Sequence, residues 1–107
     1  MPFADSRAAR RFDPDKYQKV TLLATERSAV DVYCLLPGQS QRLHTHAETD
    51  KYYVILEGEA RVRIGEEERV LGPGWAALAG PGVPHAIAND GPGPAVVLVF
   101  QAPKAYG

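Results

Sequence analysis

Apolar and polar residues alternate along most of this chain in short runs, and no stretch convincingly shows the apolar spacing of an amphipathic helix. Residues 30–36 place valine, valine, cysteine and leucine on alternate positions. Residues 60–64 alternate alanine, valine and isoleucine with two arginines. Because side chains of a β-strand point alternately to its two faces, both runs predict strands, the second with a charged outer face.

Glycine and proline separate these runs and mark the turns between them. Strands are predicted at 17–25, 30–36, the stretch up to His46, 51–56, 60–64, 68–71, 75–79, a run beginning at His85, and 95–102. About nine short strands at this spacing predict an antiparallel all-β sandwich or barrel. Periodicity alone does not choose among all-β folds.

The first part of the chain differs from the rest. Residues 1–16 are polar and arginine-rich, so we expect an N-terminal arm without a core of its own. Residues 17–107 have the length and composition of one domain.

Composition and charge narrow the range of partners. The net charge of -1 gives no reason to expect nucleic acid or anionic lipid. The N-terminus has no apolar segment typical of a signal peptide, and the longest apolar run, 95–100, is too short to span a bilayer. The single cysteine, Cys34, excludes an internal disulfide and fits a reducing compartment, so we expect a cytoplasmic protein.

The chain contains only three histidines. His44 and His46 are separated by one residue, which places both imidazoles on one face if they share a strand. His85 follows a stretch rich in glycine and proline. Imidazole binds several divalent transition metals, so iron, nickel, manganese, zinc or copper are candidate ions for a site formed by all three.

The residues around these histidines resemble the two sequence motifs of the cupin family. The first motif is matched by Gly38, His44, His46 and Gly58, and the second by Gly74, Gly82, His85 and Asn89. The resemblance covers about residues 30 to 101. Two positions depart from the motifs: Gly80 replaces a proline, and Lys51 replaces the glutamate that serves as a metal ligand in the family.

The resemblance implies a jelly-roll β-barrel, also called a double-stranded β-helix, with a metal in its mouth. It implies His44, His46 and His85 as the metal ligands, with positions left open for water or substrate. In the alternative interpretation, the barrel holds no metal and the histidines hydrogen-bond a small molecule.

Lys51 determines how much of the family's chemistry applies here. We favour an outward side chain that leaves a three-histidine site. Two alternatives remain: an inward Lys51 that binds an anionic group of the ligand, or a bulge that brings Asp50 or Glu48 into the coordination position.

Other candidates for the small-molecule pocket follow from strand parity. Tyr53 shares parity with Lys51 and is expected to face inward, and Cys34 is placed inward by its own alternation. Gln101 is a candidate polar residue of the pocket wall. Trp75 is expected in the core or at a subunit interface.

These features predict a metal-binding enzyme of the dioxygenase or isomerase type that acts on a small organic molecule. A non-catalytic cupin that binds or senses a small ligand is the alternative, because one fold serves many functions. We also expect a homodimer with residues 1–25 in its interface, because the first strand is an apolar edge.

Overall fold

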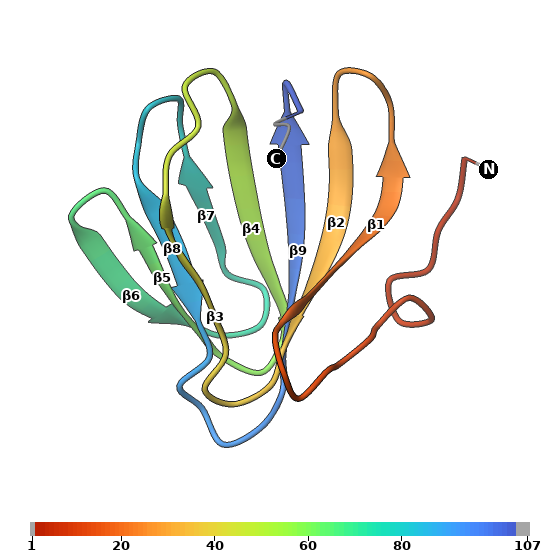
Figure 1. Ribbon diagram of the computed structural model, residues 1–107, viewed down its shortest axis with the longest axis vertical. Helices are drawn as coiled ribbons and strands as arrows, with labels where there is room; N and C mark the ends of the chain where they lie inside the picture. The colour runs from red at the N-terminus through yellow and green to blue at the C-terminus, as the bar shows by residue number, and fades with distance from the viewer. Residues whose placement is uncertain (1, 105–107) are drawn as a thin grey trace.

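The computed structural model describes residues 2–104, which contain nine strands in two antiparallel sheets (Figure 1). The larger sheet has the order β1-β2-β9-β4-β7 and the smaller has the order β3-β8-β5-β6. The strands are β1 (Gln18–Ala24), β2 (Ala29–Leu35), β3 (Ser40–His44), β4 (Asp50–Glu57), β5 (Ala60–Ile64), β6 (Glu67–Leu71), β7 (Ala76–Ala79), β8 (His85–Ala88) and β9 (Ala95–Ala102). The expected all-β antiparallel jelly-roll barrel is confirmed.

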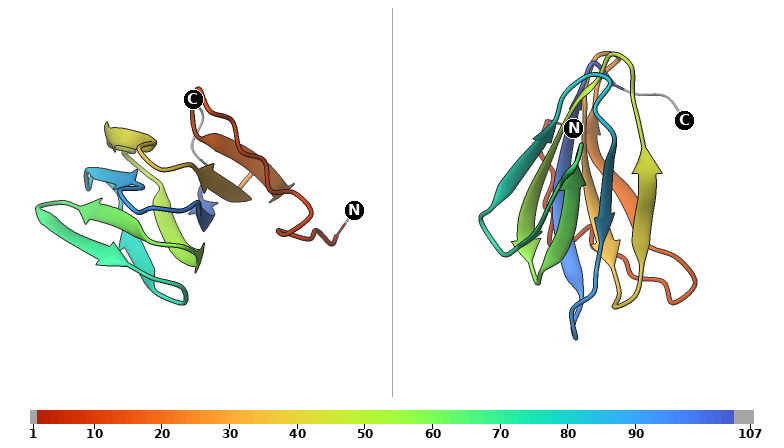
Figure 2. Two further views of the ribbon diagram at one scale, coloured as in Figure 1. Left: turned by 90° about the horizontal axis from the view of Figure 1, so that it is seen from below. Right: turned by 90° about the vertical axis from the view of Figure 1, so that its left-hand side faces the viewer.

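The two sheets enclose one main apolar core, and Figure 2 shows them as two layers. On β4, Tyr53 and Ile55 face the interior, opposite the inward residues Val97 and Val99 of the neighbouring β9. Alternate residues of these strands are buried because each strand has one face on the core. No helix in the described part of the chain is long and apolar enough to cross a membrane.

Gly58, the last glycine of the first motif, connects β4 to β5 in a left-handed backbone conformation with φ of 73°. A β-carbon at this position would collide with the carbonyl oxygen of Pro94. Glycine is therefore required here both by the backbone angle and by the close approach of a second turn.

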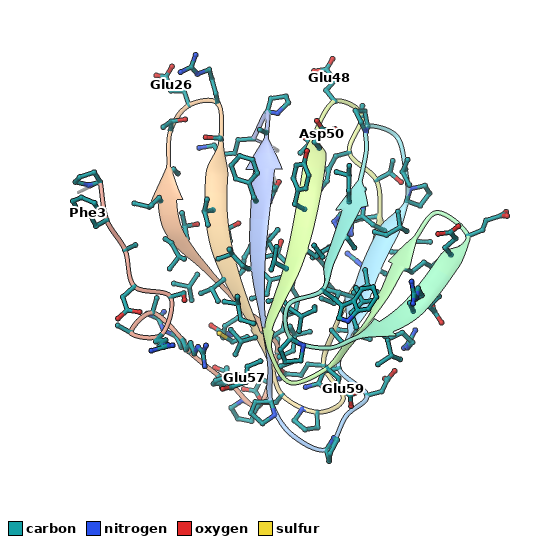
Figure 3. The ribbon with its side chains drawn as sticks, turned by 180° about the vertical axis from the view of Figure 1, so that it is seen from behind. Phe3, Glu26, Glu48, Asp50, Glu57 and Glu59 are labelled. Atoms are coloured by element: carbon teal, nitrogen blue, oxygen red, sulfur yellow. The ribbon has the colours of Figure 1, made fainter. Side chains whose placement is uncertain are left out.

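The N-terminal segment lies against the outside of the larger sheet, next to the β1–β2 edge (Figure 1). Ala9 packs on an outer apolar cluster that contains Val32 and Val96, and Arg10 forms an ion pair with Glu57 at 3.2 Å. Phe3, near the start of the segment, is 83% exposed (Figure 3).

Trp75 does not enter the core. Its side chain is 53% exposed, and the guanidinium of Arg69 lies 5.1 Å from its ring centre. The expectation of a core tryptophan is therefore wrong, and a place at a subunit interface stays a prediction.

Candidate metal centre

The three histidines converge inside one end of the barrel. His44 is the last residue of β3, His46 lies in the loop that follows, and His85 is the first residue of β8. Each offers one ring nitrogen, and these nitrogens all lie within 4.8 Å of one another. This spacing is compatible with three ligands around one ion.

The local backbone differs from the expectation that His44 and His46 share a strand. Strand β3 ends at His44, and the loop at His46 is held by a hydrogen bond from the amide of Gly82 to its carbonyl at 2.8 Å. The register of β3 against β8 also shifts, since Gln41 pairs with Ile87 but His44 pairs with His85. Strand β3 thus carries one extra residue, and this bulge directs both Gln41 and His44 inward.

Two backbone carbonyls fix the orientation of the rings. Nδ1 of His44 lies 2.8 Å from the carbonyl oxygen of Arg42, and Nδ1 of His85 lies 3.0 Å from that of Val83. A carbonyl can only accept, so each Nδ1 carries the proton and each Nε2 presents a lone pair. Nε2 of His85 is buried without a hydrogen-bond partner, as expected of a nitrogen whose partner is a bound ion.

The protonation states also suit metal binding. Desolvation lowers the pKa of His85 to about 4, because burial disfavours the charged ring. Desolvation likewise lowers the pKa values of His44 and His46. All three rings are therefore neutral at neutral pH, which is the form that binds metals.

Lys51 points into the barrel. Its side chain is 1% exposed, and Nζ lies 3.3 Å from Oε1 of Gln41 and 3.3 Å from Nε2 of His44. The expectation of an outward Lys51 is therefore wrong. Burial, with a contribution from the charge of Lys19, lowers the pKa of Lys51 to about 7, against the opposite effect of Asp31.

The acidic residues nearby do not replace the missing glutamate. Glu48 is exposed in the β3–β4 loop, and Asp50 stands at the start of β4 (Figure 3). Neither belongs to the group of candidate ligands found within residues 2–104. The donor set is therefore three imidazoles with an amine beside them.

Gln41 is the centre of a polar network that the sequence did not indicate. Its Oε1 accepts hydrogen bonds from Lys51 and from the Tyr53 hydroxyl at 3.2 Å, and its Nε2 donates to the hydroxyls of Tyr17 and Tyr33 at 3.1 and 3.4 Å. Desolvation raises the pKa of all three tyrosines, which keeps them protonated.

A cavity of about 620 Å³ opens beside the histidines, between the edge strands β1 and β3. Its walls are formed by Tyr17, Lys19, Thr21, Ala24, Ala29, Asp31, Ser40, Gln41, Arg42, His44, His46, Lys51, Gln101 and Lys104. Gln101 thus lies in the wall. Tyr53 lies behind Gln41 and does not line the cavity, so its prediction as a pocket residue is wrong.

Cys34 does not line this cavity, so its prediction as a pocket residue is wrong. It lies on the outer face of β2 with Val32, where it accepts a hydrogen bond from the amide of Arg11 to Sγ at 3.5 Å. The residues of β2 that face inward are those of the other parity, including Asp31 and Tyr33.

Comparison with known proteins agrees with the fold and the motifs. The cupin domain matches residues 31–101, which include all three histidines and Lys51. This chain belongs to the cupin family. A relative is the tetracenomycin polyketide synthase protein TcmJ of Streptomyces glaucescens, which is 38% identical over 71 residues, covering 66% of this chain. The match covers 48% of the relative, so this cupin spans about half its length.

Two solved structures extend the comparison over nearly the whole chain. TT1209 from Thermus thermophilus is 45% identical, with a TM-score of 0.95 over 98% of this cupin and 100% of the other chain. A conserved protein with a double-stranded β-helix domain from Klebsiella pneumoniae is 27% identical, with a TM-score of 0.90 over 100% and 94% of the two chains.

Proposed function

We propose that this cupin is a metal-dependent enzyme of the dioxygenase or isomerase type that acts on a small organic molecule. The observation that carries the proposal is the buried, unpaired Nε2 of His85 within a three-histidine cluster at the edge of a cavity. A buried nitrogen without a partner is costly unless the functional state supplies one.

His44, His46 and His85 would hold one divalent transition metal, with iron, nickel, manganese, zinc and copper as candidates. A redox-active ion would supply electron transfer between substrate and oxygen, and a redox-inactive ion would supply Lewis acidity. Three protein ligands leave space for a substrate to approach from the cavity.

The protein's own groups have separate roles around this centre. The Arg42 and Val83 carbonyls keep the proton on Nδ1 of His44 and His85. Lys51 is a donor at the edge of the cavity, and the Gln41 network fixes the Tyr53 hydroxyl. The apolar core behind these residues limits the access of water to one side.

A non-catalytic cupin that binds or senses a small ligand is the second candidate. The observation that favours it is the amine of Lys51 beside Nε2 of His44, because a charged amine repels a cation. The relative's name connects that protein with polyketide synthesis. Polyketide-type molecules are therefore among the substrates to test. A cytoplasmic location stays a prediction.

Elemental analysis of the untagged protein, after incubation with each candidate metal and removal of the excess, tests the proposal. We expect about one equivalent of metal per chain. His46→Ala should lose this metal and keep the β-sheet circular dichroism spectrum, and the cavity variant Thr21→Ala should keep the metal. A wild-type protein that retains none of the candidate metals would overturn the proposal and favour the binding function.

A further inference from the structure

The cavity beside the histidines is rich in positive charge. Four basic side chains line it, from Lys19, Arg42, Lys51 and Lys104, together with one carboxylate, that of Asp31. The whole chain has a net charge of -1, so the excess of basic groups is local. A cleft lined mainly by charges of one sign attracts ligands of the opposite sign.

Lys19 and Lys51 reach the same part of this cavity from strands β1 and β4. Their Nζ atoms lie 5.6 and 5.4 Å from the centre of the Tyr33 ring. Within residues 2–104, the ion pairs at cation–carboxylate distances involve Arg10 and Arg61 and neither of these lysines. Two amines that approach the same ring repel each other, and an anion between them would relieve this repulsion.

The same cavity also presents acceptors that need donors. Asp31 is 4% exposed and Gln101 is 7% exposed, and Oδ1 of the first and Oε1 of the second are buried without a hydrogen-bond partner. Both side chains line the cavity, from β2 and β9. Such oxygens are normally satisfied, so a ligand with hydroxyl groups complements them.

We infer that the cavity binds a small hydroxylated carboxylate, with its carboxylate at Lys19, Arg42 and Lys51 and its hydroxyl groups at Asp31 and Gln101. The inference rests on the proposed function, since it names the substrate class of the same site. A volume of about 620 Å³ accommodates a molecule of this kind. An amine donates hydrogen bonds whether or not it is protonated, so the role of Lys51 does not depend on its charge.

Three probes of equal carbon number separate the two parts of the inference. Protein treated with a chelator is titrated with gluconate, with sorbitol, which lacks the carboxylate, and with hexanoate, which lacks the hydroxyl groups. Binding is followed by backbone amide NMR shifts. We expect gluconate to bind at about 10 mM or below, and each of the other probes to bind at least about tenfold more weakly. Absence of gluconate binding, or equal binding of either control probe, overturns the inference.

Substitutions of cavity residues show which side chains bind the carboxylate of the ligand and which bind its hydroxyl groups. Lys19→Gln should weaken gluconate binding by about threefold to tenfold, because it removes one exposed charge from the cavity wall. Gln101→Leu should weaken gluconate but not hexanoate, since it removes an acceptor for hydroxyl groups. Lys16→Gln, an exposed lysine outside the lining residues, is the matched control and should leave both affinities unchanged. An unchanged gluconate affinity in Lys19→Gln contradicts the assigned carboxylate position.

The two proposals fail separately. If the wild type takes up none of the candidate metals but still binds gluconate, the inference is supported and the metal-dependent enzyme is overturned. Stoichiometric metal binding without gluconate binding, in chelated or metal-loaded protein, would overturn the inference and leave the enzyme proposal standing.

Discussion

The Nζ atom of Lys51 lies 3.3 Å from Nε2 of His44, the ring nitrogen that the Arg42 carbonyl leaves free for a ligand. A lysine therefore stands at the candidate metal centre where the family motif has a glutamate. The amine gives His44 a hydrogen-bond partner in the absence of an ion and opposes the charge of an ion when one binds. We therefore expect Lys51 to set the affinity of the candidate centre for a metal.

Lys51→Glu should tighten metal binding by about tenfold or more. A carboxylate at this inward position would add a fourth ligand and remove the repulsion. The metal-free variant should also be less stable than the wild type, because the new carboxylate would be buried without a cation. Competition titration with a chromophoric chelator measures the affinity, and urea unfolding measures the stability.

Lys51→Leu separates ligation from relief of repulsion. It removes the amine without adding a ligand, so its metal affinity should lie between those of the wild type and Lys51→Glu. If the leucine variant binds as tightly as the glutamate variant, the carboxylate is not a ligand.

Asn89 contributes to stability rather than to chemistry. It is 1% exposed, its Nδ2 donates to the carbonyls of Leu35 and Gly93 at 2.9 Å, and its Oδ1 accepts from the amide of Gly91 at 2.9 Å. Asn89→Ala should lower the free energy of unfolding by about 2–3 kcal/mol, because buried backbone groups lose their partners. Urea unfolding measures this loss. Metal stoichiometry of the folded variant should be unchanged, and its loss would mean that Asn89 also supports the site.

The ion pair between Arg61 and Asp90 should make stability depend on pH. Nε of Arg61 donates to Oδ2 of Asp90 at 2.6 Å, and this bond holds the pKa of Asp90 below its usual 3.8. Because the pKa of Asp90 is lower in the folded than in the unfolded protein, the ion pair stabilises the fold at pH values above the unfolded-state pKa. This stabilisation is lost as the pH falls through the folded-state pKa. The wild type should therefore be more stable than Asp90→Asn at about pH 6 and equal to it at about pH 2.

Salt provides the control for this pair. Both side chains are exposed, so the difference at about pH 6 should shrink in about 1 M salt. A difference between wild type and variant that persists at low pH would contradict the electrostatic origin.

The outer face of the larger sheet predicts self-association. One row across this face contains Leu78 of β7, Tyr52 of β4 and Phe100 of β9. Their side chains are 48%, 38% and 38% exposed, in that order. Aromatic residues on an open sheet face are typical of interface cores. A homodimer with residues 1–25 in its interface therefore stays our prediction, and light scattering at micromolar concentration should give the dimer mass.

Two variants locate the contact. Phe100→Glu should shift the protein toward the monomer mass, whereas Val70→Glu should not, because Val70 is 60% exposed on β6 of the other sheet. Deletion of residues 1–16 should promote dissociation on dilution. A wild-type monomer at these concentrations would make the prediction wrong.

Alternation predicted the strands well because most of them bury one face. It failed to assign Cys34 because β2 is buried on both faces: its inner side contacts the core, and its outer side is covered by the N-terminal segment at Ala9. When both faces are apolar, parity separates two sets of residues but does not say which set is inside.

The sequence singled out the three candidate ligands and one residue of the cavity wall, Gln101, but not the polar network around Gln41. The motifs marked His44, His46 and His85, and these three do come together. Gln41 was missed because strict alternation places it on the opposite face from His44. Only the bulge between them, which depends on pairing with β8, puts both side chains inside.

The extra residue in β3 also bears on how this site can diversify among cupins. Point substitutions change the chemistry at Gln41 or His44 one position at a time, since the backbone keeps both turned inward. Deletion of one residue between them would restore regular pairing and leave both side chains facing inward, because residues two apart on a regular strand share a face. A single codon lost at this point would thus retain the support of Lys51 and Tyr53 together with the three imidazoles, whereas the same loss in a regularly paired strand would turn the side chains on one side of it to the other face of the sheet.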